Sequence, residues 1–414
     1  MTLSNRNAYT LWGIGALFYL YQFVLRLAPS VMMEDLMRDF SIDATGFAAL
    51  GSIAMLSYSA CQIPLGLFAD RYGVRRSILI FLSFCIGGTL IFSLSSTLLG
   101  AQVGRFLIGV GSAAAFLCTS KILNHVFPRE KCATMLGLTM VVGTIGALNG
   151  GLPLCALINR VGWRSALLIM CGIGFILLGV VAWFLKDPSQ QKQANALSLS
   201  YSLKLVFHKK ACWIFATTAI GLYIAICVLG DLWGVAFMMK THGIERALAV
   251  ELVSTLYVGL CVGCFVIPWM SDRIKRAKPL VIISILCLLC LLSVLLAPIS
   301  LPFGLYYPLF SLIGFFSGAE MLCFAGACKA VSSSVAGLIT GFINGLVMMG
   351  GALAQQSVGV LLDWLWAGER GANGIKIYTI SDYRLALSLM IPIIVMALCA
   401  SLFIKDTHPQ QKGT

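Results

Sequence analysis

Four charged residues lie inside long apolar segments of this sequence: Arg26, Arg105, Asp231 and Glu320. A charged side chain in hydrocarbon costs about 3 kcal/mol on insertion scales, so such residues pair with one another or act on an ion, a proton or a substrate. A guanidinium suits bidentate contact with a carboxylate or another anion. A buried carboxylate takes up a proton when no cation is near and releases it when one returns.

The segments around these charges predict an all-α membrane protein. Of the 414 residues 59% are apolar and 11% charged, and the mean hydropathy is +0.93. Soluble domains carry about a quarter charged residues, and β-barrels alternate polar and apolar positions, which this chain does not. Uncharged runs of about 20 residues suit helices that span a bilayer. The twelve predicted spans are 9–33, 46–67, 77–97, 101–122, 134–157, 165–185, 212–239, 248–270, 279–299, 305–328, 335–362 and 384–404.

The twelve spans divide into two copies of six. The stretches Leu107–Cys118 and Leu312–Cys323 agree at seven of twelve positions with an offset of 205, and further echoes follow in the same order. Parallel six-helix repeats hold a substrate between their halves in one large class of transporter. We therefore expect an N-terminal bundle over 1–185, a linker over 186–211, and a C-terminal bundle with its tail over 212–414.

The distribution of Lys and Arg predicts the orientation. With the N-terminus inside, 17 of these residues fall on the inner side and 8 on the outer side. The positive-inside rule then places both termini in the cytoplasm. The net charge of +13 is spread over short loops, which favours a role in membrane topology over nucleic-acid binding.

Arg26 and Asp231 are counterparts under the repeat offset of 205. At about 1.5 Å per residue, both lie roughly 7–9 Å outward from the middle of their spans, so we expect them to face each other across a central cavity. One interpretation is an ion pair that holds helices together. The other is that Arg26 binds a substrate anion while Asp231 takes an amino group or a proton. The remaining candidate substrate contacts are Gln22 and Tyr19, on the helical face of Arg26, together with Trp233 and Asn344.

Glu320 is a candidate for proton coupling, because its counterpart in the first repeat is Ala115. A carboxylate present in only one repeat is not required by the shared fold. Asp231 is the other candidate, and the alternative for Glu320 is a static, hydrogen-bonded side chain. Arg105 on the fourth span either participates in coupling or clamps the backbone of a neighbouring helix. Lys121 and Lys329 are expected to extend to the cytoplasmic interface.

No pattern in the sequence predicts an enzyme or a cofactor. The 15 cysteines fall almost entirely inside apolar spans, where a thiol usually packs as a small apolar group. All four His lie outside the predicted spans, and neither a phosphate-binding loop nor a nucleophile motif is visible. We expect no metal site and no cofactor.

The stretch Gly66–Arg76, GLFADRYGVRR, resembles the loop motif between spans two and three of the major facilitator superfamily. The fourth span adds Arg105, Gly109 and Gly111, which are similar to a second pattern of that family. The resemblance extends over the whole chain through the repeat and the topology. The positions that fit the loop motif are Gly66, Asp70, Arg71, Gly73, Arg75 and Arg76.

The resemblance implies that this loop forms part of an inner gate. Asp70 would meet the cytoplasmic end of span eleven and stabilise the outward-facing state, and Gly66 and Gly73 would permit a tight turn. Asp272 and Arg273 belong to the second copy, a weaker latch that has Pro268 in place of the first Gly and lacks the second. In span five Ala147 replaces a Pro of the family's antiporter element, which disfavours drug–proton exchange.

The function predicted from these features is secondary transport of a small polar, carboxylate-bearing metabolite, an amino acid or similar nutrient, coupled to protons. YLYQFVLRLAPSVM and KIYTISDYRLAL also resemble a bacterial branch that includes phagosomal transporters of intracellular pathogens, which implies amino acids, nucleosides, peptides or organic anions. The alternatives are an uncoupled facilitator, an exporter of organic anions, siderophores or drug-like compounds, and a sensor with a transporter fold. The expected setting is a monomer in the lipid bilayer of a bacterial inner membrane.

Overall fold

A computed structural model describes residues 5–185, 206–299, 301–330, 336–371 and 374–405. Within these residues twelve helical segments are long and apolar enough to cross a membrane. Each overlaps one predicted span, from Ala8–Val31 at the start to Ile380–Ser401 at the end. The prediction of an all-α integral membrane protein with twelve spans is confirmed.

Several spans consist of more than one helical element. The elements of the first half are α1 (Asn5–Leu27), η1 (Ala28–Val31), α2 (Met33–Phe40), α3 (Ala44–Tyr72), α4 (Val74–Leu94), α5 (Leu98–Val126), α6 (Arg129–Gly150), α7 (Leu152–Val161) and α8 (Trp163–Phe184). Those of the second half are α10 (Lys210–Ala225), η2 (Ile226–Trp233), α11 (Gly234–His242), α12 (Arg246–Ile274), α13 (Lys278–Leu296), η3 (Phe303–Leu305), α14 (Tyr306–Ser317), α15 (Glu320–Ala330), α16 (Ala336–Leu365), α17 (Ile380–Leu387) and α18 (Met390–Ser401).

The interruptions inside spans fall at glycines, a proline and a widened turn. Gly151 separates α6 from α7, and Pro153 is in the first turn of α7. Span seven passes through the π-helix η2, all of whose residues are buried. Irregular backbone at membrane depth is tolerated where protein surrounds it, and π-turns often occur at functional sites.

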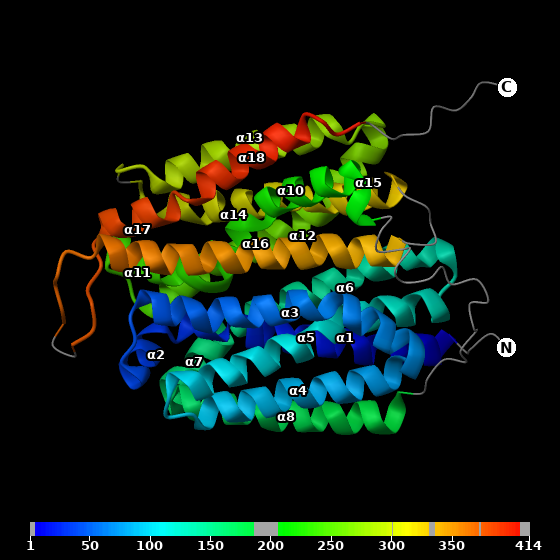
Figure 1. Cartoon of the computed structure of the whole chain (residues 1–414), viewed down its shortest axis with the longest axis horizontal. Coiled ribbons are helices and arrows are strands. Elements are labelled where there is room, and N and C mark those ends of the chain that lie inside the picture. The colour runs from blue at the N-terminus through cyan, green and yellow to red at the C-terminus, as the bar shows by residue number, and fades with distance from the viewer. Residues whose placement is uncertain (1–4, 186–205, 300, 331–335, 372–373, 406–414) are drawn as a thin grey trace.

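The elements α1–α8 form one group of helices and α10–α18 form another beside it (Figure 1). Two helix pairs make most of the contact between the groups: α3 packs along α16, and α6 packs against α12. The domain boundaries stay a prediction, and most of the linker expected over 186–211 lies outside the described residues.

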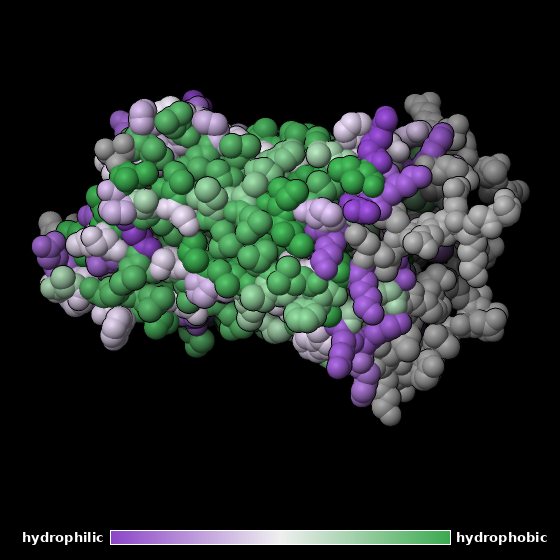
Figure 2. All heavy atoms as spheres, turned by 90° about the horizontal axis from the view of Figure 1, so that it is seen from above, coloured by the Kyte–Doolittle hydropathy of each residue, from purple (hydrophilic) through white to green (hydrophobic). Residues whose placement is uncertain are grey.

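An apolar middle section separates two ends that carry hydrophilic residues (Figure 2). We call the end where α1 begins and α18 finishes the terminal end, and the end with α2 the opposite end (Figure 1). This distribution matches a protein whose middle lies in hydrocarbon and whose ends lie at the two interfaces.

The tight turn between spans two and three depends on Gly73 and not on Gly66. Gly66 lies inside α3, seven residues before the turn, so the expectation that both glycines form the turn was wrong for Gly66. Gly73 has a φ of 88°, in the region that favours glycine. In the second copy the residue after α12 is Lys275, which has a φ of 56°. A side chain in this backbone region is more strained than the glycine of the first copy.

Candidate functional site

The centre of the candidate site is an ion pair between Arg26 of α1 and Asp231 of η2, one from each group of helices. Arg26 Nε donates to Asp231 Oδ2 at 3.0 Å, and Nη2 donates to the same oxygen. Tyr257 of α12 donates its hydroxyl proton to Oδ1 at 2.7 Å. The side chain of Asp231 is 2% exposed and that of Arg26 15%. Removing either partner would therefore leave an unpaired charge that is largely buried.

The backbone around Asp231 is shaped to bring these groups together. Gly230 precedes Asp231, and a Cβ there would lie 2.7 Å from the Tyr257 hydroxyl oxygen. The missing side chain is what lets Tyr257 approach. Gln355 of α16 donates Nε2 to the carbonyl of Cys227 in the same π-helix at 2.7 Å, which satisfies a buried backbone group.

Aromatic rings surround the Arg26 guanidinium. Its Cζ atom lies 5.5 Å from the centre of the Phe23 ring and 6.0 Å from the centre of the Tyr223 ring. The rings come from α1 and α10, so both groups of helices contribute to the setting of the cation. Cation–π attraction of this kind strengthens when water is excluded.

Glu320 begins α15, directly after the break between α14 and α15, and is 4% exposed. Its carboxylate lies within electrostatic range of Arg26. Among the described residues it has no hydrogen-bond or ion-pair partner. A buried carboxylate without a partner is more stable in the protonated form, and it is suited to bind a proton transiently.

Arg105 connects the backbones of two helices of the first group. Its Nε donates to the Leu50 carbonyl at 2.8 Å, and its Nη1 donates to the Leu25 carbonyl at 2.9 Å. Of the two interpretations proposed for Arg105, this geometry favours the backbone clamp. Leu25 directly precedes Arg26, so the clamp also holds the backbone of the candidate site in place.

The remaining residues predicted to contact the substrate do not contact the Arg26–Asp231 pair directly by hydrogen bonds. Tyr19 packs against the rings of Phe23 and Phe116. Gln22 is buried. Trp233 is fully buried and donates its indole N–H to the Gln355 carbonyl at 3.2 Å, a geometry that favours packing over substrate contact. Asn344 of α16 donates Nδ2 to the Tyr58 hydroxyl of α3 at 3.1 Å, across the two groups.

Reasoning from sequence missed Tyr257, Tyr58 and Gln355. Each is an uncharged polar residue in an apolar span, so the search for charges passed over it. Spacing offered no substitute signal, because the partners of these residues lie on other helices. A list of every Tyr, Gln and Asn in the spans would have included them without ranking them.

The two groups of helices are clasped together at the opposite end. Arg246 at the start of α12 donates Nη1 to Asp35 at 2.9 Å and Nη2 to Glu34 at 3.2 Å, both on α2. Lys376, between α16 and α17, bridges Asp43 at 3.3 Å and Asp363 at 2.8 Å. We refer to these six residues as the clasp.

The backbone at the start of α3 joins the clasp. The Thr45 N–H donates to Asp363 at 2.8 Å, and the Tyr378 hydroxyl accepts from the Ala44 N–H at 3.0 Å and donates to Asp363 at 2.6 Å. Burial opposes the charge of Lys376, but the hydrogen bonds and charges of Asp363 and then Asp43 raise the pKa of its ammonium group above the ordinary value. The ammonium therefore stays charged across the physiological range.

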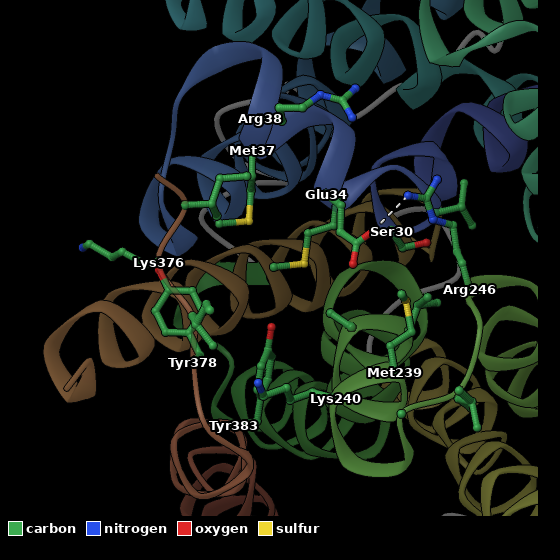
Figure 3. A pocket seen from close by; sticks show the side chains of 18 residues that line it. Ser30, Glu34, Met37, Arg38, Met239, Lys240, Arg246, Lys376, Tyr378 and Tyr383 are labelled. Carbon is green, nitrogen blue, oxygen red and sulfur yellow. Dashed lines mark hydrogen bonds and ion pairs between the residues drawn. The ribbon is translucent and has the colours of Figure 1, made fainter. Parts of the chain in front are cut away.

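A cavity of about 610 Å³ opens beside the clasp (Figure 3). Its walls come from both groups of helices and include Ser30, Glu34, Arg246, Lys376 and Tyr383. The Glu34–Arg246 ion pair crosses between the groups at its edge (Figure 3). The cavity therefore lies at the edge of the interface between the two groups of helices, at the opposite end.

At the terminal end, Asp70 pairs with Lys121 of α5, within its own group of helices. Lys121 Nζ also donates to the Gly66 carbonyl at 3.0 Å, so this lysine is engaged with the loop motif and does not simply extend to the interface as expected. The predicted contact of Asp70 with the end of span eleven involves the neighbourhood of 331–335, which lies outside the described residues.

The remaining residues of the two loop copies have local contacts. Arg75 Nη2 donates to the Ala182 carbonyl at 2.7 Å. The guanidinium of Arg71 lies over the Tyr72 ring, and that of Arg273 over the Trp269 ring. Asp272 lines a smaller cavity of about 170 Å³, and Arg76 lines neither cavity.

Twelve spanning helices in two groups, with a charged pair buried between them, are an architecture found in membrane transporters. The chain belongs to the Major Facilitator Superfamily, whose family pattern matches residues 11–355. This result confirms the resemblance drawn from the loop motif.

Some distant relatives match most of the chain. The membrane sensor protein UhpC of Escherichia coli (strain K12) is 23% identical over 389 residues, 87% of this chain and 86% of the relative. A probable hexose phosphate transport protein of Chlamydia pneumoniae is 21% identical over 402 residues, 88% of each chain. The inward-facing, unoccupied crystal structure of a bacterial homologue of the human lysosomal transporter Spinster superposes with a TM-score of 0.77 and 14% identity, over 97% of this chain and 99% of that one.

Proposed function

We propose that this protein is a secondary transporter that moves a small organic anion through the membrane by alternating access, coupled to protons. The observation that carries the proposal is the Arg26–Asp231 pair, which joins the two groups of helices across a buried interface. In alternating access the groups rock about a site between them. A cation and a carboxylate, one on each side, give a substrate ion a means of influencing that movement.

An anionic substrate competes with Asp231 for Arg26. Both donating nitrogens of Arg26 meet a single oxygen, Oδ2, while Tyr257 occupies Oδ1. A substrate carboxylate or phosphate offers two oxygens to the guanidinium fork and makes a bidentate contact that Asp231 does not make here. Asp231, still held by Tyr257, then becomes available for a substrate amino group or for a proton.

The substrate class follows from these charges. A carboxylate-bearing nutrient such as an amino acid would use Arg26 and Asp231 together. One relative is named as a probable hexose phosphate transport protein, which favours an anionic sugar derivative on the same guanidinium. The property common to both substrates is the anionic group, and we assign its binding to Arg26.

Proton coupling is assigned to Glu320. Its buried carboxylate lacks a partner among the described residues and lies within range of the Arg26 charge. When the substrate neutralises Arg26, or when rocking moves Arg26 away, Glu320 binds a proton more tightly. When the cation returns, the proton leaves.

We also propose that the terminal end faces the cytoplasm of a bacterial cell, with the chain a monomer in the inner membrane. The excess of Lys and Arg on that side supports this orientation. In this orientation the clasp holds the two groups of helices together on the outer side of the membrane.

The test is a thermal-shift screen of the purified protein against amino acids, sugar acids and sugar phosphates, followed by uptake into proteoliposomes. We expect at least one anion to stabilise the wild type, and Arg26→Ala to abolish that shift while the variant is still expressed and folded. Unchanged stabilisation of Arg26→Ala would remove Arg26 from the site. Uptake that ignores an imposed pH gradient would exclude proton coupling.

A sensor that binds a ligand without transporting it is the second candidate, because one relative is named as a membrane sensor protein. The proteoliposome assay separates the two candidates. A ligand that stabilises the purified protein but is neither taken up nor exchanged would favour the sensor.

A further inference from the structure

A small group of polar side chains lies where α3 of the first group meets α16 of the second. It consists of Tyr58 and Gln62 on α3 and Asn344 on α16, and we call it the α3–α16 polar cluster. Asn344 Nδ2 donates to the Tyr58 hydroxyl at 3.1 Å. Next to it, Ser59 Oγ donates to the Gly345 carbonyl at 2.6 Å. Both contacts join the two groups of helices at one level.

Gln62 is the unexplained member of the cluster. It lies one helical turn after Tyr58 on the same face of α3, and the residue is 4% exposed. Its side-chain Nε2 is buried and makes no well-aligned hydrogen bond among the residues that the structure describes, although the amide interacts with the neighbouring Tyr58 hydroxyl. Buried amide donors are nearly always well paired, so this one has capacity for a better-aligned acceptor than the chain provides.

The cluster belongs to the surroundings of Arg26. The Tyr58 hydroxyl lies within electrostatic range of the Arg26 guanidinium, and the Tyr19 hydroxyl lies within range of both. A ligand whose acid group occupied Arg26 would therefore extend toward a set of uncharged donors and acceptors. An amide and a phenol each donate and accept, as a hydroxyl does.

We propose that the α3–α16 polar cluster binds hydroxyl groups of the substrate, and hence that the transported anion is polyhydroxylated, a sugar acid or a sugar phosphate. This inference rests on the proposed function, because Arg26 must hold the acid group. A plain aliphatic anion or a simple amino acid offers the Gln62 amide no better acceptor than the Tyr58 hydroxyl. A site that hydrogen-bonds a hydroxyl rejects ligands that lack it far more strongly than an apolar pocket rejects extra bulk.

The position of the cluster gives substrate hydroxyls an effect on conformation. Tyr58 and Gln62 move with one group of helices and Asn344 with the other. A hydroxyl that bridges them ties the groups together at this level. Substrate without hydroxyls binds only at Arg26 and lacks this bridge.

The experiment compares affinities of matched ligands by isothermal titration calorimetry in detergent. D-glucuronate and glucose 6-phosphate are the hydroxylated anions, and hexanoate and L-leucine are the anionic and zwitterionic controls. The variants are Gln62→Leu and Asn344→Leu. The matched control is Gln356→Leu, another glutamine at this interface, whose amide oxygen accepts from Ser52 Oγ and whose amide nitrogen donates to the Thr45 carbonyl.

We expect the wild type to prefer a hydroxylated anion, and Gln62→Leu and Asn344→Leu each to weaken its binding by more than about tenfold. Gln356→Leu should change it by less than about twofold. Equal weakening of hydroxylated and plain anions in Gln62→Leu would overturn the inference, as would full affinity in both cluster variants. Gln62→Asn, which keeps the amide, serves as a second variant if Gln62→Leu does not fold, and it should retain part of the affinity.

The outcomes distinguish this inference from the proposed function. If L-leucine or hexanoate binds best and Arg26→Ala abolishes that binding, the cluster has no role in recognition and the transport proposal stands. If glucuronate binding persists in Arg26→Ala, the proposed function fails, and the inference that depends on it fails as well.

Discussion

Arg26 and Asp231 are separated by 205 residues along the chain, occupy equivalent positions in the two repeats, and form an ion pair between the two groups of helices. The pair thus links the two groups of helices through positions that the sequence repeat relates.

Single substitutions of this pair should destabilise the protein more than a double one. Arg26→Met or Asp231→Leu leaves an uncompensated buried charge, and we expect a loss of about 3–5 kcal/mol of unfolding free energy. Arg26→Met with Asp231→Leu should recover most of that loss and still fail to bind substrate. Denaturation in detergent and ligand-induced thermal shifts measure the two effects. Single variants as stable as the wild type would contradict the burial argument.

Tyr257→Phe tests the second contact of Asp231. The substitution removes a hydrogen bond to a buried carboxylate, and we expect a loss of about 1–3 kcal/mol in stability. Tyr307→Phe is the control, because its hydroxyl meets Glu251 at 3.2 Å in an exposed place. The same denaturation assay should show a smaller loss for this control. Equal losses in the two variants would mean that burial of Asp231 does not increase the effect.

Glu320→Gln should separate proton coupling from substrate movement. The amide keeps the size and polarity of the side chain but binds no proton, so uptake driven by a pH gradient should fall by more than about tenfold. Exchange of labelled for unlabelled substrate at equal pH should persist. Both rates are measured in the same proteoliposomes. Loss of exchange together with uptake would place Glu320 in substrate binding and not in coupling.

Lys376→Met should weaken closure at the opposite end. The variant removes the cation between Asp43 and Asp363 and leaves two carboxylates close together. A cysteine at Met37, which lines the cavity there, should react with a membrane-impermeant maleimide several times faster in this variant than in the Met37→Cys parent. Arg370→Ala, at an exposed arginine whose side chain donates to the Gly374 carbonyl and lies over the Trp366 ring, removes no ion pair and should leave the rate unchanged.

The clasp should not respond to physiological changes in pH. The pKa of Lys376 is raised in the folded protein, so its contribution is fully present below the ordinary lysine value and disappears only as the pH rises through the higher folded value. The labelling rate in the Met37→Cys parent should therefore be flat between about pH 6 and 9, after correction for maleimide chemistry. A rate that climbed steeply within that window would assign the clasp to a different titrating group.

Asp70 and Lys121 should act as one unit at the terminal end. Asp70→Asn and Lys121→Met each remove the same ion pair, so we expect them to lower the uptake rate by similar factors, and the double variant to lower it no further. Additive effects would mean that Asp70 has another partner, as expected from the family motif. Unchanged uptake in all three variants would make the loop a determinant of topology only.

Much of the architecture was predictable from the order of residues. Apolar runs long enough to cross the hydrocarbon predicted twelve spans. Each run was expected to be helical because a segment in the bilayer must pair its backbone N–H and C=O groups internally. The repeat offset related Arg26 to Asp231, and the structure shows that these two side chains form an ion pair. The loop motif indicated the family. Each of these features is local in the chain or is a comparison of one segment with another.

The contacts that make the site depend on the packing of segments far apart in the chain. The π-helix at Asp231, the approach of Tyr257 over Gly230 and the buried amide of Gln62 beside Tyr58 leave no mark in hydropathy or charge. Asp70 meets Lys121, and Arg105 meets two backbone carbonyls, where pattern alone left several partners open. Hydrophobicity places a helix in the membrane, but the rotation of that helix and the neighbours of its polar groups follow from side-chain packing against other helices, which a linear pattern does not contain.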